Sequence, residues 1–425
     1  MEFFRKYKKI IIAIIFLAII CLLGYLIWQT FFKPNITVTT PPGDTGTVNI
    51  GGLNLSDDGS PNYSETTGDG SLNTDDNTGG INNGNDNGDG VPTGNEASDL
   101  AIGGLTKTKT LTTDPVLAPI MTSNNQLRYY NNSDGKFYTL NDKGKLVTLS
   151  DKVFHQVQNV TWASDGDQAI LEYPDGSKIN YNFDTQKQVT LPKHWEDFSF
   201  SPTGNNISAK SMGDDVENRY LITANADGSK AASLSAIGNN ANDVYPIWSP
   251  NNQVAALYTR GVDFNRQEVF FVGLNNENFK STIINGRGFE PQWSDKGDAL
   301  LYSVYSSDNN MNPSLWLVDA QGDNIGQDRT NLGLSTWASK CTFASNSEVY
   351  CAVPENLPEG SGLFPELADK TSDLLYKIDT NTGSKKLIAI PENASNISSI
   401  MVGSDQKVLY FTDKLTGQIY SVQLK

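Results

Sequence analysis

The feature that most constrains the fold is a short pattern that recurs along most of the chain. An apolar run ends at a large residue, a polar turn follows, and a second apolar run begins, as in EPQWSDKGDALLYSV from Glu290 and YPIWSPNNQVAALYT from Tyr245. Apolar runs of this length between turn residues predict β-strands. The position of the large residue is taken, at intervals of 41, 38, 48, 45, 50 and 59 residues, by Met121, Trp162, Phe200, Trp248, Trp293, Phe343 and Val402. Units of this size predict a repeat architecture with one four-stranded sheet per unit.

The two ends of the repeat region predict how the units are arranged. After Val402 the chain contains only two more apolar runs, KVLYFTD and GQIYSVQL, whereas one spare run, Leu105 to Thr112, precedes the first unit. If the spare strand completes the last sheet, the ring closes without an exposed strand edge. We therefore expect an all-β fold, a monomeric seven-bladed β-propeller over residues 105–425 that is closed by an N-terminal strand.

The turn that follows the large residue resembles that of a known family. Phe200-Ser201-Pro202-Thr203-Gly204 comes close to the aromatic-Ser-Pro-Asp-Gly turn of TolB-like and WD-repeat β-propellers, and Trp248-Ser249-Pro250 keeps its first half. The resemblance covers about 320 residues and implies an interaction platform. The helical domain that precedes the propeller in TolB itself has no counterpart in this sequence, so the partners of TolB are not expected here.

The N-terminus has the pattern of a membrane anchor. Residues 1–9 carry four Lys or Arg residues, and the run from Ile10 to Trp28 holds 19 residues without a charge. That length approaches the roughly 20 residues with which a helix spans a bilayer. Because basic residues gather before the run, the N-terminus should stay in the cytoplasm. A cleaved signal peptide would have a shorter apolar core and a small-residue cleavage site. We expect a single-pass signal anchor at the cell membrane, with the propeller extracytoplasmic.

Residues 34–104 predict a disordered linker. This stretch of 71 residues is rich in Gly, Asn, Asp, Ser and Thr, and it holds 11 acidic residues but no Lys or Arg. Such a composition buries too little apolar surface to offset the entropy of ordering. Within it, NDNGDGVPTGNE matches the ligand spacing of a calcium loop at Asn85, Asn87, Asp89 and Glu96. No helical pattern flanks the match, and tracts of this composition produce it by chance, so we expect neither a metal nor a cofactor.

Two cysteines fall on one predicted hairpin. Cys341 and Cys351 flank the turn at 344–347, and Cys21 lies in the predicted anchor. Outside the cytoplasm a cross-strand disulfide would form, and the alternative is two buried free thiols.

The loops between second and third strands open onto the same face as the loops between blades, and several are long. The longest, Pro354 to Asp373, carries apolar residues where a plain blade needs only a short turn. Such residues predict either a docking knob or a loop that folds back over its own blade. Four of the seven arginines also fall in loops of this face and could receive an anionic partner. The candidate partner-binding residues are therefore Arg219, Arg260, Arg266, Arg287, Leu363, Phe364 and Leu367.

The sequence favours a binding module over an enzyme. It contains two histidines without a partner pattern, no Gly-x-Ser-x-Gly nucleophile elbow and no phosphate loop. The net charge of −16 argues against nucleic acid as a partner. We expect a scaffold that binds another protein of the cell envelope or surface. The alternative is a propeller enzyme, a lyase or glycan-active hydrolase, with carboxylates gathered at the central channel. A third possibility, compatible with the long linker, is a passive spacer or surface-layer component.

Overall fold

The computed structural model describes residues 96–425 apart from 142, 143 and 276. Antiparallel sheets dominate this part of the chain, and its helices are short 3-10 turns. None of the helices in the described part is long and apolar enough to cross a membrane. The anchor expected over residues 10–28 lies outside the described residues. So does the expected linker up to residue 95, with Asn85, Asn87 and Asp89 of the calcium-loop match.

Seven sheets follow one another along the chain, and we call them blades 1 to 7. Blades 1 and 2 consist of β3 (Val116–Met121), β4 (Leu127–Asn131), β5 (Lys136–Leu140) and β6 (Leu146–Thr148), then β7 (Asn159–Trp162), β8 (Gln168–Glu172), β9 (Lys178–Asn182) and β10 (Gln188–Leu191). Blades 3 and 4 consist of β11 (Trp195–Phe200), β12 (Asn206–Met212), β13 (Arg219–Asn225) and β14 (Ala232–Ala236), then β15 (Val244–Pro246), β16 (Val254–Gly261), β17 (Arg266–Gly273) and β18 (Thr282–Asn285).

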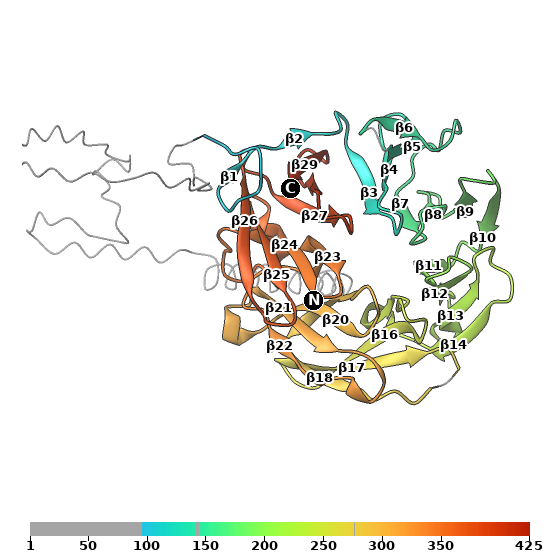
Figure 1. The fold of residues 1–425 in the computed structure, drawn as a ribbon. Coiled ribbons are helices and arrows are strands. Elements are labelled where there is room, and N and C mark those ends of the chain that lie inside the picture. Colours follow the sequence, from blue (N-terminus) through green and yellow to red (C-terminus); the bar gives the residue numbers. More distant parts are fainter. Residues whose placement is uncertain (1–95, 142–143, 276) are drawn as a thin grey trace, which may run out of the picture. The chain divides into compact units, whose positions relative to one another are not determined.

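Blades 5 to 7 continue the same order. Blade 5 consists of β19 (Arg287–Trp293), β20 (Ala299–Tyr305), β21 (Pro313–Asp319) and β22 (Thr330–Asn331). Blade 6 holds β23 (Cys341–Ser345), β24 (Glu348–Pro354), β25 (Asp373–Asp379) and β26 (Lys385–Pro391), and blade 7 holds β27 (Ile397–Val402), β28 (Val408–Asp413) and β29 (Ile419–Gln423). The first strand of each blade lies toward the inside of the ring and the fourth toward the outside (Figure 1). The predicted seven-bladed all-β propeller is therefore confirmed.

The N-terminal segment pairs differently from the single strand expected over Leu105 to Thr112. It forms two short strands, β1 (Leu105–Thr106) and β2 (Lys109–Thr110). β1 adds to blade 6 as a fifth strand, parallel to β26, whereas β2 pairs antiparallel with β29 of blade 7. The chain thus crosses from one blade to the next within a few residues.

The repeated large residue marks the end of the innermost strand and the packing between blades. Five of the seven first strands end at the aligned residue, namely at Met121, Trp162, Phe200, Trp293 and Val402. The indole of Trp162 donates to the carbonyl of Ala118 in blade 1 at 2.8 Å, and that of Trp293 donates to the carbonyl of Ile247 after β15 at 3.1 Å. Each apolar cluster likewise draws its side chains from two neighbouring blades. The repeated pattern therefore specifies the contact between blades, since these rings bury large apolar area there.

Candidate functional site

Consecutive antiparallel strands place the second-to-third-strand loops and the inter-blade loops at one end of every sheet. We call this end the loop face. Its second-to-third-strand loops include residues 213–218 in blade 3, 262–265 in blade 4, 306–312 in blade 5 and 355–372 in blade 6, and we call the last of these the insertion.

The insertion is held against the neighbouring blade. The backbone N–H groups of Gly360 and Gly362 donate to the carbonyls of Asn310 and Met311 at 2.9 and 2.8 Å. A Cβ on Gly362 would lie 2.5 Å from the Cβ of Tyr305, so only glycine allows this close approach. These bonds fix residues 360–362 on blade 5, and the side chain of Asn396, just before β27 of blade 7, donates to the carbonyl of Ala368 further along the insertion.

The apolar side chains of the insertion remain exposed although its backbone is fixed. Leu363, Phe364 and Leu367 are 45%, 52% and 45% exposed. The 3-10 turn η6 (Pro365–Ala368) holds Leu367 on the surface while it buries Ala368. Phe264, at the tip of the blade 4 loop, is exposed to 72% and was not among the residues singled out from the sequence. The sequence signal that could have identified Phe264 is an aromatic residue placed between two turn-forming residues, Asp263 and Asn265.

A cavity of about 530 Å³, which we call the insertion cleft, lies between the insertion and blades 5 and 7. Its apolar wall includes Phe289, Tyr305, Trp337, Leu363 and Pro365. Ligand sites in proteins have this size and this predominance of apolar lining.

A buried ion pair lies beneath the insertion cleft. Lys340, in the short turn η5 (Ala338–Lys340), lines the cleft, and its Nζ donates to both carboxylate oxygens of Asp373 at 3.1 and 2.9 Å. The second oxygen also accepts the backbone N–H of Ile397 at 2.6 Å. Burial lowers the pKa of Lys340 and raises that of Asp373, while their mutual attraction opposes both shifts. The charges of Lys340 and Asp373 are therefore paired with each other rather than free toward the cleft.

A second cavity of about 270 Å³ adjoins the insertion cleft, since Tyr305 and Leu363 line both. We call it the arginine cleft, because Arg287 lines it together with Phe264 and Met311. Arg287 donates to the backbone carbonyl of Asp263 at 3.3 Å and forms no salt bridge with a described residue.

The other arginines predicted for this face are engaged within their own blades. Arg266 pairs with Asp263 at 2.7 Å, and Arg260 pairs with Glu268 at 2.6 Å and lies over the ring of Phe270. Arg219 donates to the carbonyl of Gly213 at 3.1 Å. The structure therefore brings one of the four, Arg287, into a cleft together with Leu363.

The innermost strand of blade 5 positions the residues of both clefts. Its ladder with β20 breaks between Arg287 and Glu290, which is a β-bulge, and Gly288 adopts a φ of +65° there. A bulge redirects side chains on either side of it. Accordingly Arg287 lines the arginine cleft, whereas Glu290 lines the insertion cleft, where it accepts the backbone N–H of Ser339 at 2.6 Å.

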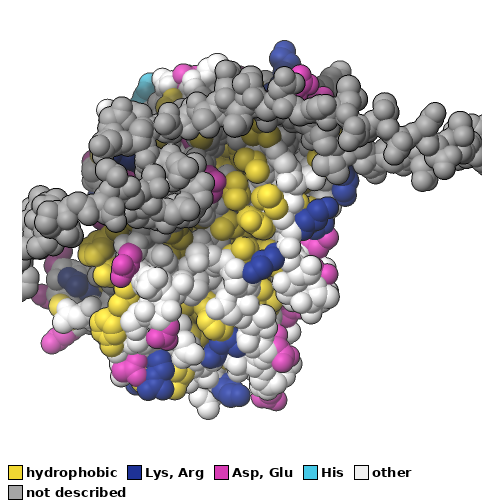
Figure 2. Space-filling view, turned by 90° about the vertical axis from the view of Figure 1, so that its left-hand side faces the viewer, with side chains coloured by type: hydrophobic (Ala, Val, Ile, Leu, Met, Phe, Trp, Pro, Cys, Tyr) yellow, Lys and Arg dark blue, Asp and Glu magenta, His cyan; other side chains and the backbone are white. Residues whose placement is uncertain are grey.

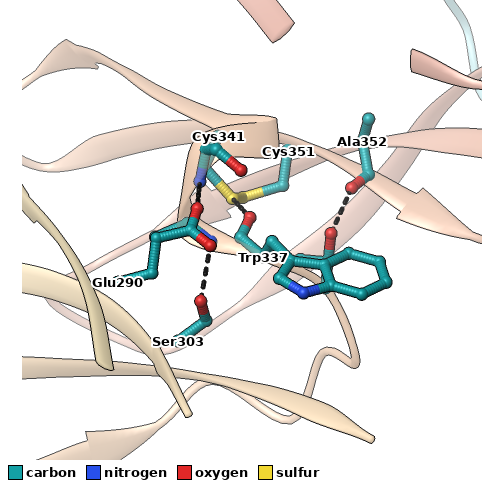
Figure 3. The surroundings of a disulfide bond; sticks show 9 residues. Glu290, Ser303, Trp337, Cys341, Cys351 and Ala352 are labelled. Carbon is teal, nitrogen blue, oxygen red and sulfur yellow. Dashed lines mark hydrogen bonds between the residues drawn. A yellow bond between two sulfur atoms is a disulfide. The ribbon is translucent and has the colours of Figure 1, made fainter. Parts of the chain in front are cut away.

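The sulfur atoms of Cys341 and Cys351 are joined in a disulfide across β23 and β24 (Figure 3). The Cys341 sulfur also lies 3.6 Å from the carbonyl oxygen of Trp337, in the segment that lines the insertion cleft. Cys351 lies three residues before Pro354, where β24 ends and the insertion begins. The disulfide therefore joins the segment after Trp337, which lines the insertion cleft, to β24, the strand that leads into the insertion.

Hydrophobic side chains also gather on the side of the ring that carries β1 and β26, where Lys and Arg border them (Figure 2). Exposed Leu100, Ile102 and Leu105 belong to the N-terminal segment that hydrogen-bonds to blades 6 and 7. This surface involves outer strands rather than the loops, so it is not part of the candidate site.

No metal site is apparent in the part of the chain that the structure describes, where no three His, Cys, Asp or Glu side chains gather suitably. Glu96, the one described residue of the calcium-loop match, is exposed.

No protein-family model matches the chain, and no curated protein matches it. Among solved structures it is similar to an oligogalacturonate lyase in complex with manganese, with 12% identity, a TM-score of 0.49, and coverage of 75% of this chain and 93% of that one. An oligogalacturonate lyase from Vibrio parahaemolyticus has 11% identity and a TM-score of 0.48, with coverage of 75% and 93%. The WD40 repeats of RRP9 have 10% identity and a TM-score of 0.47, with coverage of 75% and 97%. At these values the similarities carry no argument about function, and the strand order itself identifies the chain as a seven-bladed β-propeller.

Proposed function

We propose that the protein is a membrane-anchored, extracytoplasmic propeller that binds another protein of the cell envelope through its loop face. The observation that carries the proposal is the insertion, which presents Leu363, Phe364 and Leu367 to solvent on a backbone fixed to blade 5. Exposed apolar side chains that cluster on one surface mark interaction sites. Since the loop is already ordered, a partner that covers it would lose little affinity to loop ordering.

The anchor and the compartment rest on the sequence and on the disulfide. Basic residues before the apolar run of Ile10 to Trp28 favour a cytoplasmic N-terminus and an extracytoplasmic propeller. The disulfide of Cys341 and Cys351 supports an oxidising compartment, where such bonds persist. In this proposal β2 is the strand that closes the ring, and the module acts as an interaction platform, as its resemblance to TolB-like propellers implies.

The alternative, a lyase or glycan-active hydrolase with carboxylates at the channel, has less support from the described residues. Of the three acidic residues on the described innermost strands, Asp197 is engaged by Lys210 at 2.6 Å and Glu290 by the backbone of Ser339, while Glu196 is exposed. His155 and His194 are both exposed, in the loops that precede blades 2 and 3.

Site-specific photo-crosslinking in cells that produce the full chain tests the proposal. A photoreactive amino acid replaces Leu363 in one variant and Ile283 in the other, because both side chains are 45% exposed but Ile283 lies on the outer strand β18. We expect one dominant crosslinked protein from position 363 and none from position 283. The same products from both positions, or none from 363, would contradict the proposal.

A further inference from the structure

We propose that the arginine cleft binds a carboxylate of the partner while a neighbouring apolar side chain of the same segment enters the insertion cleft. This inference rests on the proposed function and specifies the partner chemistry: a peptide segment in which an acidic residue lies beside a large apolar one.

The charge of Arg287 is the first argument. Its side chain is half-buried in the cavity and donates only one long hydrogen bond, of 3.3 Å, to a backbone carbonyl. The nearby carboxylate of Asp263 is occupied by Arg266 at 2.7 Å, and Glu290 by the backbone of Ser339. The guanidinium therefore keeps donors for an acceptor from outside, and a carboxylate suits its planar fork best.

The local backbone is shaped around this guanidinium, which is the second argument. A Cβ on Gly261 would lie 2.5 Å from Nη1 of Arg287, and the other atoms nearest to it are also of that guanidinium. The absence of a side chain at position 261 thus leaves the space that the Arg287 head group occupies. On the other side, the β-bulge after Arg287 directs it away from the insertion cleft.

The third argument is that the two clefts lie next to each other. Because Tyr305 and Leu363 line both cavities, a carboxylate at Arg287 and an apolar group against Phe289 or Trp337 would belong to one short segment. Besides Asp263 and Asn265, the arginine cleft is lined by the side chains of Phe264, Tyr305, Met311 and Leu363. The apolar part of this lining suits an apolar amino-acid side chain next to the carboxylate.

The test measures binding of defined probes to the full chain by fluorescence anisotropy. The probe is a fluorescein-labelled dodecapeptide of Gly and Ser with a central Phe-Asp pair, and its matched control carries Phe-Asn. We expect the Phe-Asp peptide to bind about tenfold to a hundredfold more tightly, since hydrogen bonds to a charged group have this effect. Unlabelled trigalacturonate, a carboxylate-bearing glycan, is added as a competitor.

Protein variants localise the effect. Arg287→Met should remove the preference for Phe-Asp, and Gly261→Ala should weaken it without changing charge, because the new methyl group displaces the guanidinium. Arg260→Met is the control, since it removes the same charge from the same face at a side chain that lines neither cleft. It should leave both affinities unchanged.

The outcomes separate this inference from the function on which it rests. Equal binding of both peptides overturns the carboxylate inference but leaves apolar docking intact. Binding of neither peptide also overturns the carboxylate inference. It is likewise overturned if trigalacturonate displaces the Phe-Asp peptide and Arg260→Met weakens peptide binding as much as Arg287→Met does. Crosslinking at position 363 decides the proposed function independently, because it requires no acidic group in the partner.

Discussion

Replacing Asp373 by Asn should destabilise the propeller far more than its single lost charge suggests. The Asp373 side chain is fully buried, its carboxylate accepts from Lys340 at 2.9 and 3.1 Å, and it also accepts the backbone N–H of Ile397 at 2.6 Å. The Asn side chain keeps one acceptor oxygen for Lys340 and the Ile397 N–H, and it places an NH₂ donor where the second carboxylate oxygen had been. Removing one partner of a buried pair costs about 3–5 kcal/mol, because the other charge stays desolvated. This is a large share of the roughly 5–15 kcal/mol that holds a domain folded.

Urea unfolding of the full chain, followed by tryptophan fluorescence and circular dichroism, measures this loss. Asp369→Asn is the matched control, since its carboxylate pairs with Lys414 but is 42% exposed, and it should lose at most about 1 kcal/mol. Adding Lys340→Met to Asp373→Asn should recover most of the stability, because no unpaired charge then remains buried. A loss in Asp373→Asn no larger than in the control would refute the reasoning.

Three further predictions concern stability. Replacing Cys341 and Cys351 by Ala should lower the free energy of unfolding by about 2–3 kcal/mol, as loop closure over a separation of 10 residues implies, measured by urea titration with and without reductant. Gly288→Ala should cost at least about 1–2 kcal/mol by the same assay, because the residue adopts a φ of +65° and an added Cβ would overlap a neighbouring tyrosine ring, whereas an unchanged midpoint would exclude this strain. The hydrogen bond from Lys377 lowers the pKa of Glu348, so the stability that Glu348 adds is present above its usual pKa of 4.5 and is lost as pH falls through the lowered value. Glu348→Gln should therefore flatten the acid-side decline of the urea midpoint, and an unaltered pH profile would speak against the linkage.

The architecture could be read from the sequence because one local pattern controls both strand ends and blade contacts. Trp293 ends its strand and reaches the previous blade in the same way as Trp162, so recurrence along the chain translates directly into recurrence in space. The pairing of the N-terminal strands could not be read, because two-residue strands carry no periodic signal. The division of the segment between blades 6 and 7 depends on tertiary contacts alone.

The candidate site was predictable as a surface but not as a set of contacts. The sequence placed Leu363 and Phe364 on an inserted loop and Arg287 on the same face. The sequence does not reveal which arginine keeps free hydrogen-bond donors, because this depends on side-chain geometry. In the structure Arg260 and Arg266 each form a salt bridge with an acidic residue of the same blade, whereas Arg287 forms none with a described residue. The pairing of Lys340 with a carboxylate 33 residues away also has no local signal.

The N-terminal crossing from blade 6 to blade 7 has a mechanical consequence. From the N-terminal side, Ser98 bridges to Thr106, Ala101 donates to the carbonyl of Gln423 in blade 7, Gly103 donates to that of Ile388 in blade 6, and the pairing of Lys109 with Ser421 in blade 7 comes last. A pull on the chain from its N-terminal side would load these bonds in that order. The bonds of residues 98–106 to blades 6 and 7 would thus have to break before β2, the fourth strand of blade 7, could be peeled away.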